Sequence, residues 1–167
     1  KEILKRYFKT GKGEYSYKDK FLGIKMPVLR KLSKKYKDIS LFDIEKLLKN
    51  QYHEVRVFAI ILLLSKYDDY QDEVYNLYIK NIDYINNWDL VDQSAHKIIG
   101  RYIHDNNLSK EIVYELSNSN NMWHQRISII STHYFIENNE FNDALKLCKK
   151  FLKTEHDLIK KAIGWTL

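Results

Sequence analysis

The sequence predicts an all-α fold made of helical repeats, and three observations support this prediction. The 167 residues include one proline and five glycines, so few residues interrupt regular structure. Apolar residues recur three and four positions apart over long segments, which is the period of a helix, and no segment shows the alternation of a strand. Predicted helices also begin at a regular interval of 35 residues, at His53, Trp88, Trp123 and Leu158.

Local signals predict where individual helices begin. Pro27 is typical of a first helical turn and predicts a helix through Tyr36. Ser40 with Asp43 resembles a capping arrangement before a helix over 41–48. Asn142 is expected to cap a helix over 143–152. Periodicity predicts the remaining helices over 53–67, 71–81, 88–104, 109–117, 122–137 and 156 to the end.

The chain is basic and has a single thiol. Lys and Arg outnumber Asp and Glu by 28 to 22, which favours a polyanionic partner without choosing between nucleic acid, membrane and acidic protein. Cys148 has no partner for an internal disulfide, so a reducing, cytoplasmic compartment is expected. Apolar runs such as 58–64 are too short for a membrane helix, and we expect a soluble chain without a leader.

The 35-residue interval predicts a helical-repeat array. The interval is near that of tetratricopeptide, ankyrin and HEAT-like repeats, but the signatures of the first two are missing. We therefore predict a HEAT-like helical-repeat solenoid, an α-α superhelix, in which the second helix of each pair lines a concave face. One such domain is expected over 1–167 and, because the chain ends within a predicted helix, to continue beyond residue 167. The stretch from Thr10 to Met26, which holds three of the five glycines, is the one long irregular segment expected.

Equivalent positions of the repeats predict a basic column on the concave face. The fourth residue of each repeat helix is Arg56, Val91, Arg126 and Lys161 in turn, so three of four repeats carry a cation there. Such a column suits a phosphate backbone. Taken singly, each of these cations is more often a solvated charge or an ion-pair partner.

Two tryptophans and a carboxylate share the face of that column. Trp88 and Asp92 lie one turn apart, and Trp165, seven residues after the predicted start of the last helix, lies on the same face. Lone tryptophans are more often core residues, and a lone carboxylate among aliphatic residues is more often bonded to backbone amides. Their combination with Arg126 on one face favours a working surface over core.

Four segments of the chain resemble a known family. These segments are FLGIKMPVLRKL, NNWDLVD, MWHQR and KKAIGW, and they span nearly the whole chain. In this order and spacing they are similar to the DNA alkylation repair proteins, which are HEAT-like-repeat DNA glycosylases. The resemblance implies an active cleft formed by Trp88, Asp92, Arg126 and Trp165, and no departure from the family pattern occurs at these positions.

The implied activity is hydrolysis of the N-glycosidic bond of cationic alkylated purines, of the 3-methyladenine and 7-methylguanine type, in duplex DNA. Asp92 would stabilise the oxocarbenium ion that develops on the deoxyribose. Trp88 and Trp165 would flank the cationic base. Arg126 is assigned to a backbone phosphate. Weaker DNA contacts are expected from Arg56, Lys161, Lys25 and Arg30.

Other chemistries find less support in the residues. The segment from His53 to Arg56 begins like a zinc protease motif but lacks its second histidine, and no Gly-rich phosphate loop is present. We therefore expect no metal and no cofactor. We expect a monomer that acts in base excision repair, in a bacterial-type cytoplasm, and is nucleoid-associated when bound to DNA. Two alternatives remain open: a non-catalytic DNA-structure-binding paralogue, and a protein-interaction scaffold.

Overall fold

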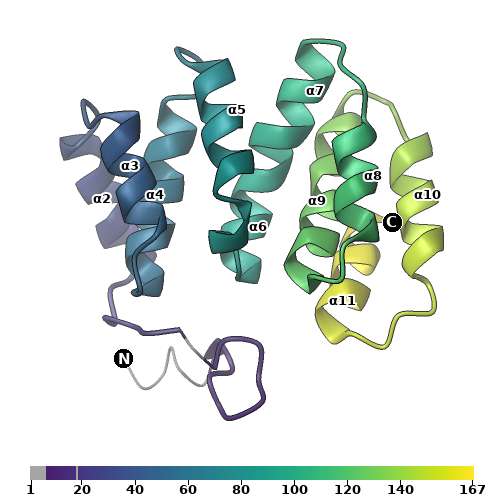
Figure 1. Cartoon of the computed structure of the whole chain (residues 1–167), viewed down its shortest axis with the longest axis horizontal. Coiled ribbons are helices and arrows are strands. Elements are labelled where there is room, and N and C mark those ends of the chain that lie inside the picture. Colours follow the sequence, from purple (N-terminus) through teal and green to yellow (C-terminus); the bar gives the residue numbers. More distant parts are fainter. Residues whose placement is uncertain (1–6, 18) are drawn as a thin grey trace. The chain divides into compact units, whose positions relative to one another are not determined.

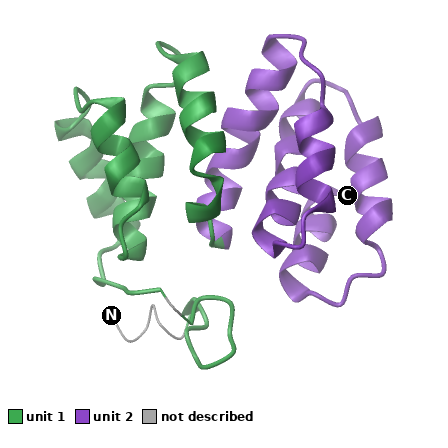
Figure 2. Cartoon of the chain, viewed as in Figure 1, with its two compact units in different colours: residues 1–87 green, residues 88–167 purple. Residues whose placement is uncertain are grey.

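The computed structural model describes residues 7–17 and 19–167 of the chain. They divide into two compact units, residues 1–87 and residues 88–167, which Figure 2 shows in separate colours. The elements of both units are helices, and within the described residues the β-type pairing is limited to an isolated bridge between Lys20 and Tyr52. The predicted all-α class is therefore confirmed. The expected single domain over 1–167 stays a prediction.

Unit 1 is built around helix α4, against which α2 and α3 pack. The α4 segment is apolar on most of its surface, and Val57, Ile60 and Leu63 are buried. Ser40 caps α3 as predicted, because its hydroxyl accepts from the Asp43 amide at 3.1 Å. The helices of this unit in Figure 1 are α2 (Met26–Lys35), α3 (Leu41–Leu48), α4 (His53–Ser65), α5 (Gln71–Lys80) and the 3-10 turn η1 (Ile82–Tyr84).

The irregular stretch before α2 is held by a buried carboxylate of α4. Glu54 accepts hydrogen bonds from the backbone amides of Leu22, Gly23 and Ile24, at 2.9, 2.6 and 3.3 Å. Gly23 adopts a φ of 93°, which side-chain-bearing residues rarely adopt. Glu54 is thus a structural anchor for this loop.

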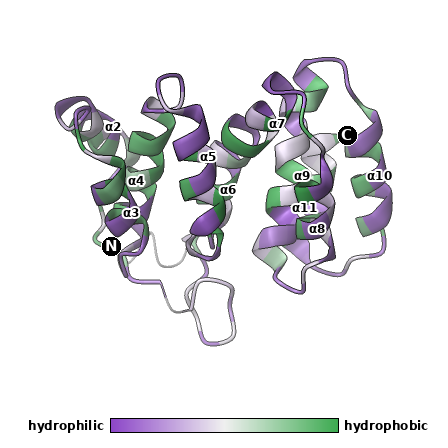
Figure 3. Cartoon of the chain, turned by 45° about the horizontal axis from the view of Figure 1, so that its top comes forward, coloured by the Kyte–Doolittle hydropathy of each residue, from purple (hydrophilic) through white to green (hydrophobic). Residues whose placement is uncertain are grey.

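Unit 2 is built around helix α9, which is buried on most of its surface. Helices α6, α8, α10 and α11 all pack on α9, and α8 lies alongside it in Figure 1. Ile127, Ile130 and Phe135 are fully buried there. Outer helices are amphipathic, as the alternation of hydrophilic and hydrophobic segments on α10 illustrates in Figure 3. The elements are α6 (Trp88–Ala95), the π-helical turn η2 (His96–Gly100), α7 (Arg101–Asp105), α8 (Glu111–Asn118), α9 (Met122–Glu137), α10 (Asn142–Phe151) and α11 (Asp157–Thr166).

The predicted helix over 88–104 forms as one continuous run that contains the π-helical turn. Gly100 closes this turn where it meets α9, since a Cβ there would lie 2.2 Å from the Ser131 carbonyl oxygen and 2.9 Å from Tyr134 Cβ. Glycine therefore permits a close approach of the two helices. Turns of this kind often occur at functional sites.

Replacing Gly100 by alanine is expected to lower the free energy of unfolding by about 2–3 kcal/mol, because a backbone carbonyl cannot easily move away from the added methyl group. Chemical denaturation measures this change. The matched control is Gly164→Ala in α11, where nothing lies within 4 Å of the new Cβ, and this variant should be as stable as the parent or about 0.5–1 kcal/mol more stable. Equal stability of both variants would show that the approach is looser than described.

The predicted starts of the four repeat helices agree with the structure to within one residue. Helices α4, α6, α9 and α11 begin at His53, Trp88, Met122 and Asp157. The expected Asn142 cap is wrong: the helix begins one residue earlier, since the Phe141 carbonyl already accepts from Leu145 N, and Asn142 is its first helical residue. In the described part of the chain, no helix is both long and apolar enough to cross a membrane.

Candidate functional site

Asp92 and Arg126 form a two-pronged ion pair within unit 2. Arg126 donates from Nε to Asp92 Oδ1 and from Nη2 to Oδ2, both at 2.8 Å. The two oxygens of the Asp92 carboxylate supply the two acceptors that this guanidinium fork needs. Asp92 lies on the second turn of α6 and Arg126 on the second turn of α9, and the packing of these two helices brings them together.

The two partners differ in exposure. The Arg126 side chain is 5% exposed, and its Nη1 also donates to the Leu158 carbonyl at the start of α11. Asp92 keeps 20% of its side-chain surface exposed. Arg126 is therefore a buried support that ties three helices together, whereas the carboxylate that it holds remains accessible from solvent.

Burial and ion pairing act on Asp92 in opposite directions. Burial raises the pKa of Asp92 above its ordinary value of 3.8, and the Arg126 guanidinium opposes this rise. The neighbouring Asp89 charge adds to the rise. Arg126 thus offsets part of the penalty that burial imposes on the charged carboxylate.

The two predicted tryptophans both belong to unit 2. Trp88 is the first residue of α6 and is partly buried. Trp165 lies in the last turn of α11 and is 56% exposed. Its ring meets His133 of α9 edge to face, with the ring centroids 4.6 Å apart. An indole this exposed is available to a ligand.

Two histidines lie beside the carboxylate and Trp165. His96 is one turn after Asp92, and its ring centroid is 6.3 Å from that of His133. Burial lowers the pKa of His96 to about 4, and the charges of Lys97 and His133 add to this effect. Burial, followed by the charge of Arg126, also lowers the pKa of His133. Both imidazoles are therefore neutral at neutral pH.

These neutral histidines predict a pH-dependent stability. His96 takes up a proton on unfolding once the pH falls below 6.5, whereas the folded protein resists protonation until about pH 4. The unfolded state thus binds more protons in this range, and the free energy of unfolding should fall as the pH drops from 6.5 towards 4. The His96 contribution is roughly 2 kcal/mol after allowance for its partial contact with solvent. Urea denaturation at several pH values measures it.

The matched variants for this measurement are His96→Gln and His156→Gln. The first should lose stability less steeply on acidification than the parent, because the buried titrating group is gone. The second changes an exposed histidine that precedes α11 and should follow the parent. Parallel curves for the parent and His96→Gln would contradict the burial of a neutral imidazole.

The cationic column is not a continuous exposed surface. Lys161 is exposed on α11, and Val91 is buried. Arg56 is 4% exposed, bonds Asp19 at 2.7 Å and donates to the Asn50 carbonyl at 3.1 Å. The expectation of a surface cation at Arg56 is therefore wrong, because a carboxylate of the preceding loop pairs with it inside unit 1.

Arg126, which was expected to contact a phosphate, is also paired with a carboxylate inside its own unit. Its guanidinium already serves Asp92 and Leu158, so a phosphate would have to displace these partners. Lys25, which precedes α2, and Arg30 within α2 are exposed in unit 1. They remain free to act as weak surface contacts for a polyanion.

Sequence reasoning missed His96, His133 and the Leu158 carbonyl. A signal for the two histidines was present, since His96 follows Asp92 by four residues and His133 follows Arg126 by seven, which are same-face spacings. The Leu158 contact involves a backbone carbonyl, which every residue has, so the residue type at this position does not indicate it.

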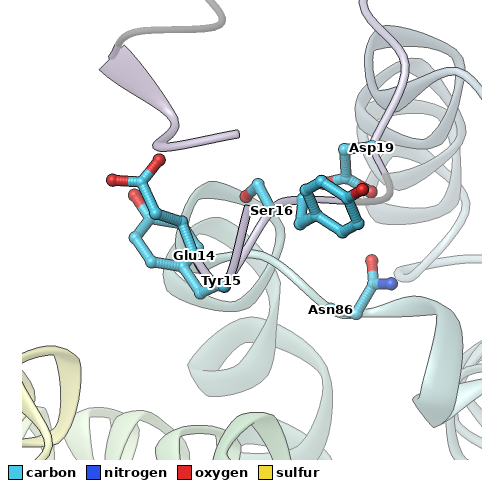
Figure 4. A pocket seen from close by; sticks show the side chains of 7 residues that line it. Glu14, Tyr15, Ser16, Asp19 and Asn86 are labelled. Carbon is cyan, nitrogen blue, oxygen red and sulfur yellow. The ribbon is translucent and has the colours of Figure 1, made fainter. Parts of the chain in front are cut away.

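Unit 1 contains a separate pocket of about 330 Å³. Figure 4 shows Glu14, Tyr15, Ser16, Asp19 and Asn86 at its wall. Asp19 is already engaged by Arg56, and Ser16 accepts from Asn87 at 2.7 Å. The predicted site residues of unit 2 do not line this pocket. Across residues 7–17 and 19–167, no group of three or more His, Cys, Asp or Glu side chains is arranged to hold a metal ion.

Comparisons with known proteins identify the family of the chain. The family described as "DNA alkylation repair enzyme" matches residues 1–167. None of the curated proteins matches the chain. A solved structure described as a predicted DNA alkylation repair enzyme from Enterococcus faecalis is similar with a TM-score of 0.76 and 21% identity, over 99% of this chain and 78% of that one, which establishes a shared fold. Because the family match covers the whole chain, this protein belongs to the DNA alkylation repair enzyme family.

Proposed function

We propose that the chain is a DNA glycosylase that releases cationic alkylated purines, of the 3-methyladenine and 7-methylguanine type, from duplex DNA. The observation that carries the proposal is the accessible Asp92 carboxylate held by buried Arg126 in a member of a DNA alkylation repair family. The reaction is hydrolysis of an N-glycosidic bond, the first step of base excision repair.

The substrate explains why a carboxylate suffices. Alkylation of a ring nitrogen makes the purine cationic and a good leaving group, so little acid catalysis is needed. As the glycosidic bond lengthens, positive charge moves to the deoxyribose, as in glycoside hydrolysis. Asp92 stabilises this charge and orients the attacking water. Arg126 holds the carboxylate in place before the substrate arrives, which is the preorganisation that electrostatic catalysis requires.

The tryptophans supply recognition of charge. A cation over an indole face gains about 0.5–2 kcal/mol, depending on how far it is desolvated. Trp165 exposes more than half of its surface, and Trp88 begins the helix that carries Asp92. In the proposal these rings flank the cationic base. They favour positive charge and do not distinguish one purine from another.

The DNA backbone is bound by exposed cations in this proposal, and the protein acts as a monomer. Lys161 is the contact nearest in sequence to Trp165, with Lys25 and Arg30 as further contacts in unit 1. The paired helices with near-regular starts support a HEAT-like solenoid with a basic concave face as the framework. Arg126 changes role relative to the sequence prediction: it positions Asp92.

The experiment that tests the function is detection of the released base. The chain is incubated with a duplex that contains 7-methylguanine, and the solution is analysed by mass spectrometry. The proposal expects free 7-methylguanine and an abasic site in equal amounts. DNA binding without a free base would support the non-catalytic DNA-binding alternative.

A binding titration separates the scaffold alternative. The affinity of a DNA-binding protein falls steeply with salt because phosphate contacts release counterions. Fluorescence titration of a duplex at two salt concentrations is expected to show this fall. An affinity for duplex that is absent at both concentrations would favour a protein-interaction scaffold.

A further inference from the structure

We infer that His133 is a positioning residue for Trp165, in that its imidazole ring fixes the orientation in which the exposed indole receives the cationic base. The orientation of the indole follows from contacts within unit 2. Its consequence for the reaction rests on the proposed function.

The first observation is the ring contact itself. The planes of His133 and Trp165 are inclined at 87°, with centroids 4.6 Å apart, which is a favourable edge-to-face geometry. Trp165 is 56% exposed on the last turn of α11. A side chain with so much free surface has little packing to select its rotamer, so this contact is a large part of what orients it.

The second observation fixes the protonation of the imidazole. Thr166 Oγ1 lies 2.8 Å from the Ala162 carbonyl oxygen, to which its hydroxyl donates. A hydroxyl has one hydrogen, so Thr166 must accept from His133 Nε2, 2.9 Å away. The neutral imidazole therefore carries its proton on Nε2. This hydrogen bond anchors the histidine to the residue that follows Trp165, and so ties the ring pair to the α11 backbone.

The third observation is the charge environment of His133. Arg126 faces it from the same helix, and His96 faces it from η2. The groups that face it from α11 are Trp165 and Thr166, which do not titrate in this range. Burial and the Arg126 charge hold the pKa of His133 below 6.5. A neutral ring beside Trp165 does not repel a cationic base, whereas a protonated ring would.

Tryptophan emission of the full chain tests the contact without a substrate. A protonated imidazole quenches a touching indole, so emission should fall on acidification from about pH 7.5 to about pH 5, with a midpoint below 6.5. The fall should be absent in His133→Gln and in Trp165→Phe, and unchanged in His156→Gln, the exposed control. A fall that persists in His133→Gln would overturn the inference.

Base release tests the consequence for the reaction. His133→Phe keeps a ring but loses the bond to Thr166, and we expect about a tenfold slower single-turnover release, since small errors of orientation are costly. His133→Gln retains an N–H donor but loses the ring contact with Trp165, so it should recover only part of this loss, with duplex affinity unchanged in both variants. Release by His133→Phe at the parent rate would refute the positioning role. Absence of release by the parent, with the emission titration as expected, would refute the proposed function and leave the ring contact established.

Discussion

Asp92→Asn is expected to slow release of alkylated purine by about a hundredfold or more, because the reaction loses the fixed negative charge that stabilises its transition state. The side chain keeps its size, and the Asn oxygen can still accept one of the two Arg126 hydrogen bonds. Duplex affinity should stay the same or increase slightly, since a negative charge near the phosphates is removed. Single-turnover release from a 7-methylguanine duplex, measured beside the dissociation constant, separates the two effects.

The matched control is Asp157→Asn. It removes an exposed carboxylate from the first turn of α11, in the same unit but without the Arg126 contact. This variant should release base at nearly the parent rate. Full turnover by Asp92→Asn would rule out the catalytic assignment, and a parallel loss of DNA affinity would assign Asp92 to binding.

Arg126→Ala is expected to lower the free energy of unfolding by about 2–4 kcal/mol. Removal of the buried guanidinium leaves the partly buried Asp92 charge without its partner, and it also removes the bond to the Leu158 carbonyl. The pKa of Asp92 should rise further without Arg126, because burial then acts unopposed. Base release should therefore fall together with stability. Chemical denaturation and single-turnover release measure the two losses.

Arg30→Ala removes an exposed arginine from α2 and should change stability by less than about 0.5 kcal/mol. Arg126→Lys keeps the charge but not the fork, so it should recover only part of the loss. Stability of Arg126→Ala equal to that of Arg30→Ala would show that the guanidinium is not a buried support. Weakened DNA binding by Arg126→Ala at unchanged stability would show that Arg126 contacts a backbone phosphate, as the sequence predicted.

Local chemistry made the helices predictable. The Ser40 hydroxyl and Pro27 determine where α3 and α2 begin, and both act over a few residues. The π-helical turn was not predicted, because it depends on a close approach to α9. Gly100 allows this approach, but a glycine in the sequence does not by itself indicate one. The same reason explains the error at Asn142: a residue suited to a cap does not act as one when the helix begins a residue earlier.

The site was predictable as a set of residues and not as a set of contacts. The 35-residue interval predicted that Asp92 and Arg126 lie on the same side of successive repeat helices. It carried no information on whether the guanidinium points to a phosphate or to the carboxylate. Arg56 illustrates the same limit, since its partner Asp19 belongs to a loop without periodicity. Ion pairs between distant segments depend on packing, which is a property of the folded chain.

The pH dependence of base release tests the central role of Asp92 most directly. Single-turnover rates, corrected for spontaneous loss of base, are measured over the pH range in which far-ultraviolet circular dichroism shows the chain folded. In His133→Gln, which has no imidazole to protonate beside Trp165, an ionised carboxylate predicts a rate that is constant near neutral pH and falls about tenfold per pH unit below the pKa of Asp92, which burial places above 3.8. A rate that rises on acidification would show that the protonated acid is the active form, and would contradict stabilisation of the sugar cation by a fixed negative charge.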